Sequence, residues 1–116
     1  MGSEVVTLVR QDGRVVVERC LVAARPLRRM KGLLGRRSLA GDEGILLRPA
    51  GSIHTLFMRF PIDVVFLDRE LVVVGITREL RPWRSAGKRG AHAALELASG
   101  ECGRRGVAVG DRLVTE

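Results

Sequence analysis

Residues 52–67, SIHTLFMRFPIDVVFL, decide the fold of this chain. The stretch contains all three Phe residues and one of the two His residues. Pro61 divides it, because proline is poorly tolerated inside a central strand. The second part, residues 62–67, is apolar except for Asp63 and therefore predicts a buried strand that carries a carboxyl group. A buried charge is costly unless it is paired or hydrogen-bonded, so we expect Asp63 to have specific partners.

Strand and turn signals continue on both sides of this stretch. The Asp-Gly pair at residues 12–13 lies between two Val-rich runs, which predicts an N-terminal β-hairpin over residues 1–22. After residue 67, residues 68–70 predict a turn and residues 71–77 another strand, so that a second hairpin forms. Other short strands are predicted at residues 44–47, 91–98 and 107–114.

One helix is predicted in the first half of the chain. Residues 26–35 place Leu27, Met30, Leu33 and Leu34 at helical spacing among several cations, which is typical of a short amphipathic helix. Residues 81–90 predict a basic loop, and residues 99–106 an irregular helical turn. We therefore expect an α+β fold, mainly antiparallel β, with a small curled or barrel-like sheet and one short amphipathic helix. The length of 116 residues predicts a single domain, residues 1–116.

The chain is basic, with a formal net charge of +7. Of its 20 cationic residues, only Lys31 and Lys88 are Lys, and the others are Arg. Two alternative explanations fit this imbalance. One is a coding bias toward G and C, and the other is selection for Arg, whose guanidinium group binds phosphates and carboxylates in a bidentate way. Charge alone therefore leaves binding to nucleic acid or to an anionic surface open, without favouring it.

The two Cys residues, Cys20 and Cys102, form neither a CxxC pair nor a zinc-ligand spacing. We expect two reduced, partly buried thiols, with one disulfide as the alternative. The sequence shows no signal peptide and no apolar run long enough for a transmembrane segment, so a cytoplasmic location is expected. No metal and no cofactor are predicted.

Three polar residues are candidates for a site, and each has a structural alternative. Asp63 is interpreted first as a structural acid that accepts backbone N–H bonds or an Arg fork, with a binding or acid–base role as the alternative. His54 alternates with apolar residues, which fits a hydrogen-bonded structural residue or the mouth of a site. Glu96 shares a strand face with His92, as on the solvated face of an edge strand or in a pocket wall. No nucleophile elbow and no phosphate-binding loop occurs.

Five motifs, in this order along the chain, resemble the landmarks of the uncharacterised prokaryotic family called domain of unknown function 192. They are GLLGR (32–36), GILL (44–47), IHTLFMRFPIDVVF (53–66), LELASG (95–100) and VGD (109–111). The resemblance runs from about residue 23 to the end and leaves residues 1–22 as an added or variable hairpin. It implies a small α+β domain with a mostly antiparallel, barrel-like sheet and no established activity. It places the family's polar landmarks on Arg36, Met58, Arg59, Asp63 and Glu96.

These landmarks and His54 form the predicted ligand-binding set. The leading hypothesis is a non-enzymatic binding or accessory protein with a polar cleft. Asp63 and Glu96 would approach Arg36 and Arg59 in this cleft, and Met58 and Phe57 would form its apolar wall. Paired Arg residues would favour an acidic ligand or peptide as the partner.

Two other hypotheses remain open. The first is a hydrolase-like enzyme that uses Asp63 or Glu96 as a general base. The second is binding of nucleic acid or an anionic surface through one continuous basic face. That face would comprise Arg28, Arg29, Arg81, Arg84, Arg89, Arg104 and Arg105.

Overall fold

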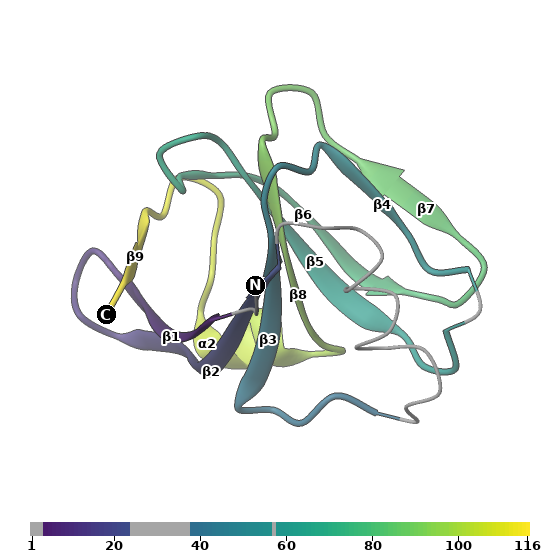
Figure 1. The fold of residues 1–116 in the computed structure, drawn as a ribbon, viewed down its shortest axis with the longest axis horizontal. Coiled ribbons are helices and arrows are strands. Elements are labelled where there is room, and N and C mark those ends of the chain that lie inside the picture. The colour runs from purple at the N-terminus through teal and green to yellow at the C-terminus, as the bar shows by residue number, and fades with distance from the viewer. Residues whose placement is uncertain (1–3, 24–37, 57) are drawn as a thin grey trace.

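In the computed structural model, which describes residues 4–23, 38–56 and 58–116, seven strands form one curled sheet (Figure 1). The strand order is β6-β5-β8-β3-β2-β1-β9. The strands of this sheet are β1 (Glu4–Arg10), β2 (Val15–Ala23), β3 (Glu43–Leu47), β5 (Ile62–Leu67), β6 (Val73–Leu80), β8 (Ala93–Ala98) and β9 (Leu113–Thr115). Two more strands, β4 (Ser52–His54) and β7 (Ser85–Gly87), form a separate two-stranded sheet, and the helix α2 spans Glu101–Arg105.

The curl brings the two edges of the large sheet together at one end. All neighbouring strands pair antiparallel except β2 and β3, which are parallel. A single bridge joins Val72 to Arg112, and the Val73 N–H donates to the Asp111 carbonyl oxygen at 2.8 Å. The start of β6 is thereby tied to the start of β9. Such closure protects edge strands that would otherwise pair with other chains.

The predicted fold class is confirmed in its main point, a mainly antiparallel and curled sheet. The helix that is described, α2, lies in the second half of the chain and coincides with the irregular helical turn expected at residues 99–106. The predicted helix at residues 26–35 lies outside the described residues, and what is described of the fold is mostly β.

One predicted loop contains a strand. Residues 81–90 were expected to form only a basic loop, but β7 lies within them and pairs antiparallel with β4. The strand is three residues long and contains Ser and Gly, so its sequence lacks the apolar alternation that predicts a strand. We call the paired strands β4 and β7 with their flanking turns, residues 51–56, 58–61 and 81–91, the arm.

Two apolar clusters lie on opposite faces of the sheet. The strand β5 is buried on both faces: Val65 and Leu67 belong to the first cluster, and Ile62, Val64 and Phe66 to the second. The first cluster draws on strands from both edges of the sheet, so it fills the inside of the curl. The second lies on the other face, where residues of the arm, such as Ile53, cover it.

Both thiols are buried and unpaired, as expected. Cys20 and Cys102 are free cysteines of the first cluster, and burial raises the pKa of each thiol to about 12. Burial suppresses formation of the reactive thiolate, so we expect neither thiol of the native protein to react with the disulfide reagent DTNB at pH 8. Both thiols should react in denaturant.

The same shift predicts a pH dependence of stability. Above the ordinary thiol pKa of 9.0, the unfolded chain releases protons that the native protein retains. The free energy of unfolding is therefore expected to decrease as the pH rises from about 9 toward 12, and a Cys20→Ala, Cys102→Ala protein should lose this part of the dependence. Urea titrations over that pH range measure both. Rapid labelling of either native thiol would contradict the prediction.

Candidate functional site

An open pocket with a volume of about 620 Å³ lies at the end of the sheet where β6 and β9 meet. Its floor is apolar and includes Leu46, Leu71 and Leu113, which are nearly or fully buried. These residues come from β3, from the turn before β6 and from β9, three places far apart in the sequence. The curl of the sheet is what assembles them. The volume of this pocket is within the range of small-ligand sites.

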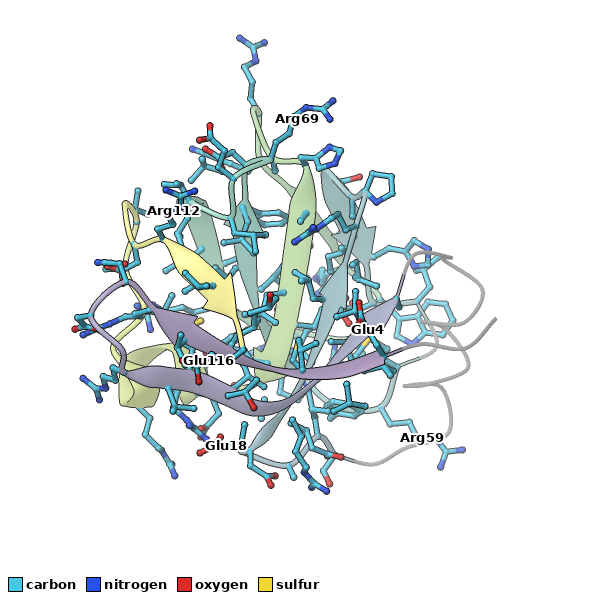
Figure 2. All side chains as sticks on the ribbon, turned by 60° about the vertical axis from the view of Figure 1, so that its left-hand side comes forward. Glu4, Glu18, Arg59, Arg69, Arg112 and Glu116 are labelled. Atoms are coloured by element: carbon cyan, nitrogen blue, oxygen red, sulfur yellow. The ribbon has the colours of Figure 1, made fainter. Side chains whose placement is uncertain are left out.

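Charged side chains surround this floor. Arg48, Arg69 and Arg112 line the pocket and are exposed, together with Glu4 and Glu70. Figure 2 looks onto this side of the molecule and shows Arg69, Arg112 and Glu4 spread around the region between β9 and β3. Within residues 4–23, 38–56 and 58–116, none of the three guanidinium groups forms an ion pair. The rim therefore has cationic groups free to meet an anion.

Hydrogen bonds hold the backbone of this rim in place. One oxygen of Asp68, Oδ1, accepts the N–H groups of Glu70 at 2.8 Å and Val72 at 3.0 Å. Within this turn Leu71 has a left-handed backbone with φ 63°, which is uncommon for a non-glycine residue. Across the pocket, Gln11 Oε1 accepts the N–H of Arg112 at 2.8 Å. The rim is therefore fixed before any ligand arrives.

Asp63 is a structural residue, as the first interpretation of the sequence held. It is fully buried on β5, and its two carboxyl oxygens accept three backbone N–H groups. Oδ1 accepts from Glu79 at 2.9 Å, and Oδ2 accepts from Gly100 at 3.0 Å and Cys102 at 3.1 Å. The carboxyl group thus joins β5, the irregular end of β6 and the start of α2. Its accepting capacity is occupied by the backbone.

Glu96 lies on the opposite face of the sheet from Asp63. On β8 it is paired with Ile45 on one side and Val64 on the other, and both belong to the second apolar cluster. Asp63 is paired instead with Leu97, which belongs to the first cluster. Residues directly opposite each other share a face of a sheet. The two acids therefore do not converge on one cleft, and the solvated edge strand that the sequence allowed for Glu96 is wrong, because Glu96 is 1% exposed.

The other predicted residues also separate. Met58 is buried in the second cluster, whereas His54 and Arg59 are exposed. In Figure 2, Arg59 projects on the side of the molecule away from Arg112. Arg36 and Phe57 lie outside the described residues, as do Arg28 and Arg29 of the predicted basic face. Of the described members of the predicted ligand-binding set, only Met58 and Glu96 lie on the same apolar face.

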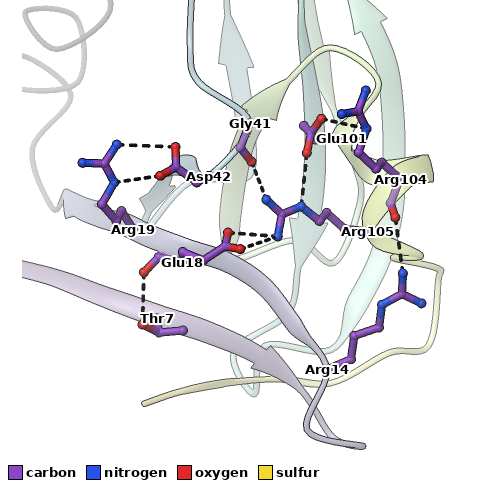
Figure 3. Close-up of polar contacts among 9 residues, drawn as sticks. All are labelled: Thr7, Arg14, Glu18, Arg19, Gly41, Asp42, Glu101, Arg104 and Arg105. Carbon is purple, nitrogen blue, oxygen red and sulfur yellow. Dashed lines mark hydrogen bonds and ion pairs between the residues drawn. The ribbon is translucent and has the colours of Figure 1, made fainter.

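The two arginines of α2 are neutralised by acids. Arg105 Nε is 3.1 Å from Glu101 Oε1, and its Nη1 is 2.9 Å from Glu18 Oε1, as Figure 3 shows. Arg104 Nε is 3.3 Å from the other oxygen of Glu101. Arg105 also donates to the carbonyl oxygen of Gly41 at 2.8 Å, so it fastens α2 to β2 and to the segment before β3. Both arginines therefore face a carboxylate, unlike the unpaired cations of an open basic face.

Comparison with known proteins places the chain in a family. Residues 7–115 match the model of domain of unknown function 192, DUF192, described as an uncharacterized ACR. This chain belongs to the DUF192 family. The match begins at residue 7 rather than near residue 23, so most of the N-terminal hairpin is part of the DUF192 domain and not an addition to it.

One curated relative and two solved structures support this assignment. A UPF0127 protein of Pyrococcus furiosus is 46% identical over 63 residues, and the alignment covers 53% of this chain and 53% of that protein. The chain thus matches about half the length of that relative. A crystal structure of a candidate transcription regulator from Sinorhizobium meliloti 1021 has a TM-score of 0.82 at 28% identity, covering 98% of this chain and 94% of the other.

The second solved structure is a protein of unknown function from Novosphingobium aromaticivorans DSM 12444. Its TM-score is 0.79 at 24% identity, with coverage of 97% of this chain and 84% of the other. At this identity the likeness shows the fold alone. The chain thus belongs to an uncharacterised family, and its fold is similar to that of two solved structures over nearly its whole length.

Sequence reasoning missed the rim of the pocket in this DUF192 protein. None of its three arginines belongs to a motif. Arg69 is 21 positions after Arg48, and Arg112 is 43 positions after Arg69. A signal was present for two of them, since Arg48 follows one predicted strand and Arg69 lies in the predicted turn between two others. Which strand ends meet depends on sheet order, which a single sequence does not specify. No candidate group of metal ligands occurs among the residues that the structure describes.

Proposed function

We propose that this DUF192 protein is a non-enzymatic binding protein for a small acid that has an apolar part, and that the ligand occupies the pocket between β3, β9 and the turn before β6. The observation that carries the proposal is the combination of a buried Leu floor with three exposed Arg residues that have no carboxylate partner in the described part of the chain. Arg guanidinium groups bind carboxylates in a bidentate way, which fixes orientation as well as charge.

The pocket differs from the cleft that the sequence predicted. An acidic ligand remains the expected partner, but the cations that support it are Arg48, Arg69 and Arg112 instead of Arg36 and Arg59. Glu4 and Glu70 on the same rim would reject ligands that carry several negative charges, because like charges in close contact repel. A single acid group on an aliphatic chain fits this lining best.

The general-base hypothesis has no comparable support. Asp63 accepts three backbone N–H groups, and neither Asp63 nor Glu96 lines the pocket. An effective general base must reach the proton that it removes, within hydrogen-bonding distance of a substrate. Binding without catalysis is therefore the function that we propose.

Octanoate is a suitable probe for this proposal. Acetate, which has the carboxylate without the long chain, and 1-octanol, which has the chain without the carboxylate, are the comparison ligands. We expect octanoate to bind more tightly than either, with amide shifts mapping to β3, β9 and residues 68–72 in a nitrogen-15 NMR titration. Arg112→Gln and Arg48→Gln should each weaken octanoate binding about tenfold, the usual effect of losing a charged hydrogen bond.

Arg14→Gln is the matched control, because it removes one charge from an exposed residue away from the pocket. Octanoate affinity in this variant should equal that of the wild type. Shifts confined to another part of the molecule, or equal losses in Arg14→Gln and Arg112→Gln, would overturn the proposal.

A further inference from the structure

The arm is basic and contains no acid. Among its residues are five cations and neither Asp nor Glu. The five, all exposed, are Arg59, Arg81, Arg84, Lys88 and Arg89. In the described part of the chain none of them forms an ion pair, whereas Arg10, Arg19, Arg104 and Arg105 on other elements face carboxylates. The arm therefore carries five positive charges and no negative charge.

The outer face of the arm is polar. Ile53 and Ala86 are directly paired and pack inward on the second apolar cluster. The neighbouring pairs therefore face outward, and their residues are exposed: Ser52, Gly87, His54 and Ser85. Arg84 precedes β7 and Lys88 follows it, so that cations stand at both ends of this strand. Figure 1 shows the arm at the edge of the molecule, away from β1 and β9.

Two large apolar side chains lie near one end of the arm. Trp83 is 55% exposed and Leu56 is 39% exposed. Their segments lie side by side, because the Trp83 N–H donates to the Thr55 carbonyl oxygen at 3.0 Å. Arg81 and Arg84 flank Trp83 in the sequence. A Trp with an adjacent Leu and surrounding cations is the composition of an interfacial membrane anchor.

We propose that the outer face of the arm docks on the surface of an anionic lipid bilayer, with Trp83 and Leu56 entering the headgroup region and the arm's cations contacting lipid phosphates. A face without acids and with several cations complements a polyanionic surface. Single-stranded nucleic acid fits less well, since it is held by several aromatic stacking platforms, and Trp83 is the one exposed side chain of the Phe, Trp or Tyr type among the described residues of the arm. The described residues contain no helix long and apolar enough to cross a membrane.

The lone Trp provides a direct test, because every change in Trp fluorescence reports on Trp83. The intact chain is mixed with vesicles of phosphatidylglycerol and phosphatidylcholine in equal parts, and with vesicles of phosphatidylcholine alone. We expect a blue shift of emission and co-sedimentation with the anionic vesicles only, with binding that weakens as salt increases. Arg81→Gln combined with Arg84→Gln should reduce partitioning about fivefold for each charge removed.

Arg14→Gln combined with Arg104→Gln is the matched control, because it removes the same net charge from residues outside the arm. This variant should retain the blue shift and nearly all of the binding. Circular dichroism of all variants checks that they fold. Absence of a blue shift with anionic vesicles, or equal losses in the two double variants, would overturn the proposal. A blue shift or quenching with a single-stranded oligonucleotide in place of vesicles would overturn it in favour of nucleic acid.

Discussion

Asp63→Asn is expected to lower the free energy of unfolding by about 3 kcal/mol, with little change in the shape of the side chain. Asp63 Oδ1 accepts the Glu79 N–H, and Oδ2 accepts those of Gly100 and Cys102. Asn can present an oxygen to one side only and turns an NH₂ group toward N–H donors on the other. At least one buried donor is then left unsatisfied, and each such group costs about 1–3 kcal/mol. Urea denaturation measures the change.

A matched control separates this effect from loss of charge. Asp68→Asn also removes a carboxylate, but Asp68 uses only Oδ1, for the N–H groups of Glu70 and Val72, and Asn retains that oxygen. We expect a loss within about 0.5 kcal/mol there, and the same for Arg59→Ala, because Arg59 is exposed. An Asp63→Asn protein as stable as Asp68→Asn would show that Asp63 does not support the fold.

Thr55→Val is expected to lower the free energy of unfolding by about 2 kcal/mol and to loosen the arm. The Thr55 side chain is fully buried, and its hydroxyl group donates to the Arg81 carbonyl oxygen at 2.6 Å and accepts the Arg84 N–H at 2.9 Å. Val has the same shape but can do neither. Since Thr55 joins β4 to the segment before β7, amide hydrogen exchange in both strands should become faster, while exchange in β3 and β8 should not.

Thr55→Ser is the control, because it retains the hydroxyl group and removes one methyl group. Its expected loss is about 1 kcal/mol, the value of a buried methylene-sized group, and the arm should exchange as slowly as in the wild type. If the amides of the arm exchange at the same rate in the Val and Ser variants, the hydroxyl group of Thr55 does not hold the two strands of the arm together.

Local signals predicted most elements of the fold. The hairpin around Asp12 and Gly13, the buried strand at residues 62–67 and the turn that follows it are all present, because they depend on residues close in sequence. The short strand β7 was missed, since Ser85–Gly87 has no alternation and is held by its pairing with β4.

The candidate site was much less predictable. The need of Asp63 for partners followed from one acid in an apolar run, but its partners are backbone groups of Glu79, Gly100 and Cys102, which no residue pattern identifies. The pocket depends on the parallel pairing of β2 with β3 and on the bridge between Val72 and Arg112. Such non-local contacts are not encoded in any short segment.

By itself, the sequence determined that a strand with an acid would be buried, that the chain belongs with DUF192 in its central motif, and that its positive charge is mostly Arg. The tertiary structure alone decided where each acid faces. Asp63 pairs with Leu97, and Glu96 pairs with Val64. A shift of this register by one residue would have placed Asp63 and Glu96 on the same face, because side chains alternate along a strand with a period of two. Register is a property of two strands, and for this reason one strand's sequence could not reveal it.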